Sequence, residues 1–346
     1  GDIGVSHCYE DVEADKESIN EVADKCYLPA NEILYHTIKK HEGRFKISFS
    51  ISGTVLELLQ QYRPDVIASF KKLVDTGCVE ILAETYYHSF SFLYSKKEFR
   101  RQVDKHAALV KELFGIIPAV FRNTELIYNN ELARYIAGMG FKGLLCEGME
   151  RILRGRTANQ LYAAPYNGDF GLLLRNISLS DDIAFRFGDT NWSQHPLTAE
   201  KYADWLHSHP ENTEVINLFM DYETFRIHKK KENGILNFLQ ALPDSVLANK
   251  HFQFSTPSTV LDKYYPRDIY NVPKTVSWEG KPDFTIICKN HIKQSDLLKK
   301  LYSLEKMATT SSCNKASDCW GRLQSADHIY FTDEEQMEND NVKQQN

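Results

Sequence analysis

The chain has 346 residues, of which 42% are apolar and 25% are charged, and its formal net charge is −6. This composition is ordinary for a globular protein, and the acidic and basic residues are interspersed, which argues against a nucleic-acid-binding surface. No apolar run reaches 18 residues, so no membrane-spanning helix is expected.

Seven cysteines are scattered along the chain, and an odd number with irregular spacing is typical of reduced cytoplasmic thiols. The segment GDIGVSHCYED has neither a basic start nor a long apolar run, so it is unlike a secretory signal peptide. Cys313 and Cys319 lie six residues apart without a CxxC or HExxH spacing, so no metal site is expected. We therefore predict a cytoplasmic protein that binds no metal.

Short apolar segments alternate with helix-length segments along most of the chain. Strands are expected at residues 45–51, 79–85, 119–126, 141–148, 172–187 (together with an exit loop), 214–221 and 252–255. Amphipathic helices are expected at residues 54–75 with a break at Pro64, 96–114, 130–139, 199–208, 234–247 and from about 256 onward. Gly115 and Gly140 follow two of these helices, where glycine commonly ends a helix.

Repeated strand–helix units predict a parallel sheet, because successive parallel strands need crossover helices between them. Such units form either an open doubly wound sheet or a closed barrel. The sequence contains no GxGxxG after its first strand and no GxxxxGK[ST], which disfavours the nucleotide-binding open sheets. We expect an α/β domain over residues 1–270, a helical region over 271–332 that includes a helix at 291–308, and a charged, disordered tail over 333–346.

Polar side chains gather where the predicted strands end. The residues concerned are Glu84, Tyr86, Tyr87 and His88, then Arg122, Asn123 and Glu125, then Asp181, Asp182 and Arg186, and finally Asp221 and Glu223. In a barrel, functional residues lie at the C-terminal ends of the strands. Carboxylates on different strands suit glycoside chemistry, in which one attacks the anomeric carbon and another protonates the leaving oxygen, about 5–5.5 Å away in retaining enzymes. The structural alternative is a set of solvated strand exits or a buried ring of salt bridges.

Four motifs, VEILAETYYHS, FRNTELIYNNELA, LSDDIAFRF and LFMDYETF, closely resemble successive motifs of glycoside hydrolase family 57, and most of all its α-amylase-like branch. The resemblance runs in collinear order from about Asp2 to Tyr330. It implies an incomplete (β/α)7 barrel followed by a short helical region. It also implies hydrolysis or 4-α-glucanotransfer on α-glucans or maltooligosaccharides, by a retaining mechanism that needs no metal or organic cofactor.

The resemblance also implies roles for individual residues. Glu125 matches the nucleophile of the family, and Asp221 matches the general acid/base. The residues expected to bind substrate are Glu84, His88, Arg122, Asp182, Glu223 and Trp278.

Three departures from the family pattern suggest a second hypothesis. The family's first strand, with its His-Gln-Pro motif, would lie before the first residue given. We therefore expect either that the chain is a fragment or that another segment or a protein partner covers an unpaired barrel edge. Arg226 replaces a family glycine, and if its side chain turns inward, it would lower the pKa of Asp221. Ile287 replaces a family tryptophan. The alternative to an enzyme is therefore a catalytically impaired relative that binds glucan or serves as a structural partner protein.

Overall fold

The computed structural model describes residues 12–227, 234–277, 292–310 and 314–330. Its strands are β1 Ile47–Phe49, β2 Val79–Ile81, β3 Val120–Arg122, β4 Gly143–Glu147, β5 Leu161–Ala164, β6 Asn167–Arg175 and β7 Asp268–Ile269. Apart from β6, which has nine residues, these strands have two to five residues.

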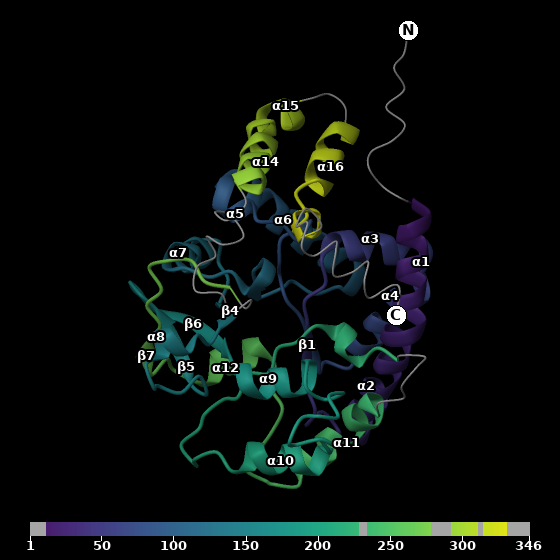
Figure 1. Cartoon of the computed structure of the whole chain (residues 1–346), viewed down its shortest axis with the longest axis vertical. Coiled ribbons are helices and arrows are strands. Elements are labelled where there is room, and N and C mark those ends of the chain that lie inside the picture. The colour runs from purple at the N-terminus through teal and green to yellow at the C-terminus, as the bar shows by residue number, and fades with distance from the viewer. Residues whose placement is uncertain (1–11, 228–233, 278–291, 311–313, 331–346) are drawn as a thin grey trace.

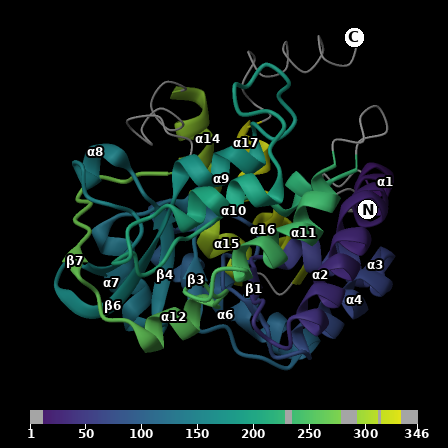
Figure 2. The same cartoon turned by 90° about the horizontal axis from the view of Figure 1, so that it is seen from below.

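Helices connect and cover these strands. The first set is α1 Val12–Val22, α2 Leu28–Lys40, α3 Gly53–Tyr62, α4 Pro64–Val74, α5 Ser91–Tyr94, α6 Lys96–Phe114, α7 Asn130–Gly138 and α8 Glu150–Leu153. The second set is α9 Ile177–Ala184, α10 Ala199–His207, α11 Ile235–Leu247, α12 Pro257–Lys263, α14 Ile292–Ser303, α15 Glu305–Thr310, α16 Asn314–Arg322 and α17 Asp327–Tyr330. Shorter turns are η1 Ala23–Tyr27, η2 Thr124–Leu126 and η3 Tyr222–Phe225. Figures 1 and 2 show β4, β6 and β7 on one side of the molecule and α1 to α4 on the other.

Local sequence signals set several helix ends. The Ser52 hydroxyl accepts a hydrogen bond from the Val55 N–H at the start of α3, and Pro64 begins α4. Ser95 caps α6 in the same way, and Gly115 ends that helix with a φ of 75°, which glycine adopts easily. The predicted break at Pro64 and the predicted helix end at Gly115 are therefore confirmed.

The strands form two sheets. β1 and β2 pair in parallel, and the second sheet has the strand order β3-β4-β6-β5-β7. An isolated parallel bridge between Ala83 and Phe121 links the end of β2 to β3. Within the described residues β2 is the one strand neighbour of β1, so β1 is an edge strand there. The α/β class predicted from the sequence is confirmed.

Two expectations about the sheet are wrong. β5 runs antiparallel to β6, because the short turn at Pro165 and Tyr166 folds the chain straight back on itself. Residues 214–221 form an irregular segment with a single bridge, from Asn217 to Arg175, where a strand is expected. The sheet is therefore mixed, and the segment that leads to the DYETF motif is only loosely part of it.

Other segments differ from prediction for local reasons. A helix, α9, follows β6 where an exit loop is expected, because the Asn176 side chain caps it by accepting the Leu179 N–H. Residues 252–255 have no strand structure. The helices α1 and α2 are missing from the sequence analysis, because the π-helical turn η1 between them shifts the 3.6-residue period on which a helix prediction depends.

Buried apolar side chains fall into four groups, one of which comprises Leu82, Val120, Leu126, Leu145, Leu161, Leu173 and Val260. The largest lies among α1 to α4, the pair β1–β2 and α9 to α11. A second fills the space between strands β3 to β6 and the helices α6 and α7. A third joins α14 to α16 to Phe90 and Ile127, which follow β2 and β3. The C-terminal helices therefore pack on the end of the molecule where those two strands finish. Figure 1 shows α14 to α16 on the same side of the molecule as α5 and α6.

The remaining expectations have mixed outcomes. None of the described helices combines the length and the apolar character that crossing a membrane requires. Helices α14 and α15 confirm the helical structure predicted for residues 291–308. Cys319 is disulfide-bonded, so the expectation of reduced thiols is wrong there, because spacing in the sequence does not report which sulfurs meet in space. The predicted tail at 333–346 and the replaced position Ile287 lie outside the described residues.

Candidate active site

Glu84 follows β2 and is almost completely buried, with 2% of its surface exposed. The Ser50 hydroxyl donates to its Oε1 at 2.7 Å, and the His88 Nδ1 lies 3.2 Å from its Oε2. Burial acts to raise the pKa of Glu84, but the hydrogen bond with His88 and the charges of His88, Arg122 and His106 outweigh burial and lower the pKa to about 2. Glu84 is therefore an anion at neutral pH.

His88 lies between two carboxylates. Its Nε2 is 3.0 Å from the Oε1 of Glu125, while its Nδ1 faces Glu84. Burial acts to lower the pKa of His88, but the hydrogen bonds with Glu125 and Glu84 raise it to about 9. A protonated imidazole donates from both ring nitrogens, so His88 links the two carboxylates as a cation at neutral pH.

The backbone that carries these side chains is strained. Glu125 follows β3 in the turn η2 with a φ of 52° and a ψ of 29°, and His88 has a φ of 49°. A left-handed conformation costs a residue other than glycine about 1–3 kcal/mol, and such strain concentrates at functional sites. The hydroxyls of Thr85 and Thr124 form a hydrogen bond at 2.9 Å, which joins the turn after β2 to the turn after β3.

Asp221 and Glu223 line a cavity of about 410 Å³ beside β1. The rest of its wall is formed by Tyr27, Phe49, Ser50, Ile51, Ser52, Val55, Leu59, Phe70 and Tyr222. Both carboxyl groups keep contact with solvent, but the protein atoms packed around them displace water, and this desolvation raises the pKa of Asp221 and of Glu223. The charge of Arg122 acts to lower the pKa of Asp221, and the charge of Glu125 acts to raise it. Asp221 is therefore close enough to both side chains for their charges to affect its protonation.

Two carboxyl groups of the candidate site, those of Glu125 and Asp221, thus have contrasting surroundings. Glu125 is in hydrogen-bond contact with a cation, which favours the ionised carboxylate. Asp221 is in a desolvated setting, which favours the protonated carboxyl. Such a division lets one carboxylate act as a nucleophile or base while a second carboxyl acts as an acid.

Arg226 does not have the effect expected of an inward-facing cation. Its Nη2 binds Glu21 on α1 at 2.9 Å, and its Nη1 lies 3.8 Å from Glu223. Desolvation by nearby protein atoms is the main influence on the pKa of Asp221, and the cation with the strongest effect on that pKa is Arg122. This arrangement is not predictable from the motifs, because α1, which supplies the carboxylate partner of Arg226, is not among the helices expected from the sequence.

The C-terminal helices hold the loop that carries His88. The Ala326 N–H donates to the His88 carbonyl at 2.9 Å, and the Tyr87 hydroxyl donates to Asp318 on α16 at 3.0 Å. Arg322 keeps Asp318 in place with an Nε–Oδ2 hydrogen bond of 2.9 Å. The strained turn after β2 is therefore fixed from two directions, by the sheet and by the helical region.

A second charged cluster joins Asp181, which the sequence singles out, to Glu147 and Arg175, which it does not. Glu147 ends β4, Arg175 ends β6 and Asp181 lies on α9; the Arg175 Nη1 is 3.3 Å from the Glu147 Oε2, and its Nη2 binds Asp181. Burial raises the pKa of Glu147 to about 7, although the charge of Arg175 acts against the rise. A signal for this cluster was present, because Glu147 and Arg175 each end an apolar segment.

The structure brings together most of the residues predicted for the site. Glu84, His88, Arg122 and Glu125 form one cluster that acts on Asp221, and Glu223 lines the same cavity as Asp221. Asp182 is placed differently. It binds Arg186, just beyond the end of α9, and its charge acts to raise the pKa of the buried Tyr202. Trp278 lies outside the described residues.

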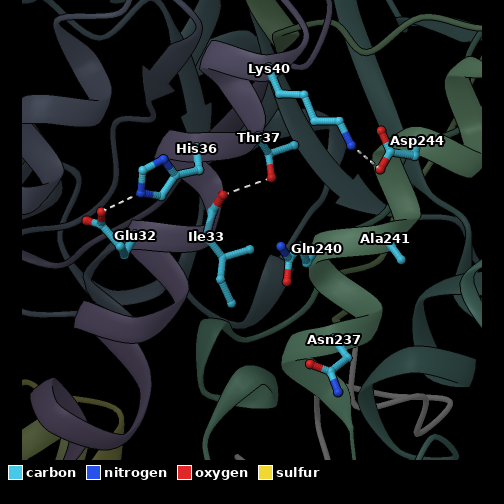
Figure 3. A pocket seen from close by; sticks show the side chains of 9 residues that line it. All are labelled: Glu32, Ile33, His36, Thr37, Lys40, Asn237, Gln240, Ala241 and Asp244. Carbon is cyan, nitrogen blue, oxygen red and sulfur yellow. Dashed lines mark hydrogen bonds and ion pairs between the residues drawn. The ribbon is translucent and has the colours of Figure 1, made fainter.

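A larger hollow of about 580 Å³ lies between α2 and α11. Figure 3 shows its charged side chains already in pairs: the His36 Nε2 is 2.7 Å from the Glu32 Oε1, and the Lys40 Nζ is 2.6 Å from the Asp244 Oδ2. None of the strand-end carboxylates lines it. We therefore assign the candidate site to the smaller cavity beside Asp221.

Comparison with known sequences identifies similar proteins. The profile described as glycosyl hydrolase family 57 matches residues 4–273. A putative alpha-amylase from Methanocaldococcus jannaschii is 40% identical over 335 residues, which cover 93% of this chain and 70% of that protein.

Solved structures with a similar fold point the same way. A GH57-type branching enzyme from Pyrococcus horikoshii matches with a TM-score of 0.70 at 12% identity, covering 91% of this chain and 81% of that chain. The 4-alpha-glucanotransferase from Thermococcus litoralis matches with a TM-score of 0.63 at 18% identity, covering 85% of this chain and 45% of that chain. This chain therefore spans less than half the length of the glucanotransferase, and both likenesses concern the fold alone.

Proposed function

The chain belongs to glycosyl hydrolase family 57, and we propose that it cleaves or transfers α-glucosidic bonds in α-glucans or maltooligosaccharides. The names of its relatives, a putative alpha-amylase and a 4-alpha-glucanotransferase, support this substrate class. The proposal concerns the part of those longer proteins that this chain matches.

In the proposed mechanism Glu125 is the nucleophile. Its carboxylate forms a bond to the anomeric carbon while the bond from that carbon to the glycosidic oxygen breaks, and Asp221 gives its proton to the departing oxygen. Asp221, now ionised, then takes a proton from water or from the hydroxyl of a second glucan, and that oxygen displaces Glu125 from the anomeric carbon. Water yields hydrolysis and a glucan hydroxyl yields transfer, in both cases with retention of configuration.

The observation that carries the proposal is the contrast between Glu125 and Asp221. Glu125 contacts the cationic His88 at 3.0 Å, and the charge of Glu125 reaches Asp221, whose pKa is raised because surrounding protein atoms displace water from its carboxyl group. We assign sugar binding to Glu84, His88 and Arg122, whose charged groups can hydrogen-bond hydroxyls, and to Glu223 on the cavity wall.

We also infer that the two sheets belong to one incomplete (β/α)7 barrel. Isolated parallel bridges support this inference, because they continue strand pairing beyond each sheet, from Ala83 to Phe121 and from Arg175 to Asn217. In such a barrel the C-terminal strand ends share one rim, as the proposed site requires.

Proton NMR of freshly formed products tests the proposal. The chain is incubated with maltooligosaccharides, and the configuration at the new anomeric carbon is read before mutarotation. A retaining enzyme releases the α-anomer first, whereas immediate release of the β-anomer would contradict the assigned roles. Glucan binding without any product would favour the catalytically impaired relative over the enzyme.

A further inference from the structure

The segment that carries Asp221 is attached to the sheet by few backbone contacts. Its single ladder position is the bridge between Asn217 and Arg175, where the Asn176 N–H donates to the Asn217 carbonyl at 2.9 Å. Beyond Asn217 the described chain has no strand structure up to the turn η3. The position of Asp221 therefore depends on contacts other than a regular β-ladder.

Side chains supply those contacts at Phe219, two residues before Asp221. The Arg175 Nε donates to the Phe219 carbonyl at 2.7 Å, and the Phe219 N–H donates to the Ser180 Oγ at 3.2 Å. Ser180 is fully buried and Arg175 is 3% exposed, so solvent does not compete for either contact. Both backbone polar groups of Phe219 are thus held from β6 and α9, and not by a neighbouring strand.

Arg175 is itself rigidly oriented. Its Nη1 faces Glu147 at the end of β4, and its Nη2 binds Asp181 on α9. The guanidinium group therefore uses each of its three nitrogens for a different partner, two carboxylates and one carbonyl. A planar fork with five N–H donors fits this task, whereas a lysine ammonium is a compact charge on a flexible stem.

We propose that Arg175 is a positioning residue for the general acid, because its hydrogen bond to the Phe219 carbonyl fixes where Asp221 meets the leaving oxygen. Ser180 assists by holding the N–H of the same residue. The inference rests on the role proposed for Asp221. It adds that the role of Asp221 depends on the side chain of Arg175, at the end of β6, which acts without touching the sugar.

The test compares leaving groups in Arg175→Lys and Ser180→Ala. Arg175→Lys keeps a positive charge between Glu147 and Asp181, and Ser180→Ala removes one uncharged hydroxyl. Maltooligosaccharides need a proton on the departing oxygen, whereas nitrophenyl maltooligosaccharides depart with little help. We expect kcat on the natural substrates to fall roughly 10- to 100-fold in Arg175→Lys, because small misplacements of a catalytic group have effects of this size. The activated substrates should lose less than about threefold, and Ser180→Ala should show the same pattern with smaller losses.

Arg267→Lys is the matched control, because the Arg267 Nε donates to Glu214, at the other end of the same segment, at 2.6 Å. Arg267→Lys should leave kcat unchanged on both natural and activated substrates. Equal losses on both classes in Arg175→Lys and Ser180→Ala, or no loss in either, would overturn the positioning role. If Arg175→Lys does not fold, as judged by thermal unfolding, Ser180→Ala decides the question.

Asp221→Asn separates the two proposals. If Asp221→Asn shows the leaving-group dependence and neither Arg175→Lys nor Ser180→Ala does, only the positioning role fails. If Asp221→Asn loses activity equally on both substrate classes, or if the unmodified chain cleaves neither class, the proposed function fails. The positioning role then fails with it.

Discussion

The two halves of the candidate site are built in different ways. On the side of the proposed nucleophile, Ala83, two residues after β2, is joined to strand β3 by backbone hydrogen bonds: the Ala83 N–H donates to the Val120 carbonyl at 2.9 Å, and the Arg122 N–H donates to the Ala83 carbonyl at 2.8 Å. On the acid side, Asp221 lies on an irregular segment that side chains hold to β6 and α9. Backbone pairing therefore determines where the proposed nucleophile Glu125 lies, whereas the proposed acid Asp221 depends on the side chains of Arg175 and Ser180 for its position.

The two halves of the candidate site also differ in how far their carboxyl groups are buried. Glu84 is buried and the Glu125 side chain is 13% exposed, whereas Asp221 and Glu223 are exposed at the cavity. A buried network keeps its charges paired at all times, because an unpaired buried charge is costly. An exposed carboxyl can exchange its proton with solvent between reaction steps, as a general acid/base must.

The largest effect should come from Glu125→Gln. Without a carboxylate no glycosyl intermediate forms, so we expect activity to fall by roughly 10³-fold or more on both natural and activated substrates. Initial rates on maltooligosaccharides and nitrophenyl maltooligosaccharides measure this. Glu131→Gln is the control, because the Glu131 side chain is 68% exposed and pairs with Lys96 on the surface. Residual activity within tenfold of the unmodified chain would remove Glu125 from the nucleophile role.

Asp221→Asn should affect one substrate class selectively. Loss of a general acid costs about 10²- to 10⁴-fold where the leaving oxygen needs a proton, and far less where it does not. The ratio of kcat/KM between natural and activated substrates measures the selectivity. The control is Asp262→Asn, which changes a surface carboxylate that pairs with Lys142. A loss that is equal for both substrate classes would show that Asp221 is not the acid.

Because His88 is held as a cation between two carboxylates, the free energy of unfolding should fall at alkaline pH. The pKa of His88 in the folded protein is about 9, above the ordinary value of about 6.5, so its contribution to stability is complete below pH 6.5 and is lost as the pH rises through 9. The unmodified chain should therefore lose roughly 1–3 kcal/mol more unfolding free energy between pH 6 and pH 10 than His88→Gln does.

Urea unfolding at the two pH values measures this difference. His36→Gln is the matched control, because the His36 side chain is 70% exposed and pairs with Glu32 on the surface. It should lose as much stability with rising pH as the unmodified chain. An equal loss in His88→Gln would mean that His88 is not held as a cation between Glu84 and Glu125.

The smallest effect should come from Arg226→Gly, which restores the residue typical of the family. Because Arg226 pairs with Glu21 on α1, its removal should change activity less than about threefold and leave the pH profile of kcat in place. Activity measured from pH 4 to pH 9 checks this. A shift of the profile to higher pH in Arg226→Gly would show that the arginine acts on Asp221 after all.

Much of the nucleophile side could be predicted from the sequence. Glu84, His88 and Glu125 follow apolar strands whose pattern is strong, and parallel strands bring their C-terminal ends to one edge. The close approach of these three side chains depends on the left-handed backbone at His88 and Glu125, which no residue type there announces. Motif resemblance pointed to these residues, but their hydrogen bonds could only come from the structure.

The acid side was less predictable, for physical reasons. An apolar pattern at 214–221 predicts a strand, but the pattern cannot report that its polar backbone groups bond to Arg175 and Ser180. The partner of Arg226 is likewise two hundred residues away in sequence, on a helix whose period is broken by a π-helical turn. Contacts between distant segments carry this half of the site, and local patterns contain little information about them.

The proposed role of Glu125 as nucleophile can be tested by trapping the covalent intermediate. The Asp221→Asn variant lacks the base that activates water, so a glycosyl-enzyme formed from 5-fluoro-α-glucosyl fluoride should accumulate. Mass spectrometry of the intact chain and of its peptides measures the label. The account predicts one added fluoroglucosyl group, attached to Glu125 within the FRNTELIY peptide. A label on another carboxylate such as Glu84 or Glu223, or continued turnover without any label, would contradict it.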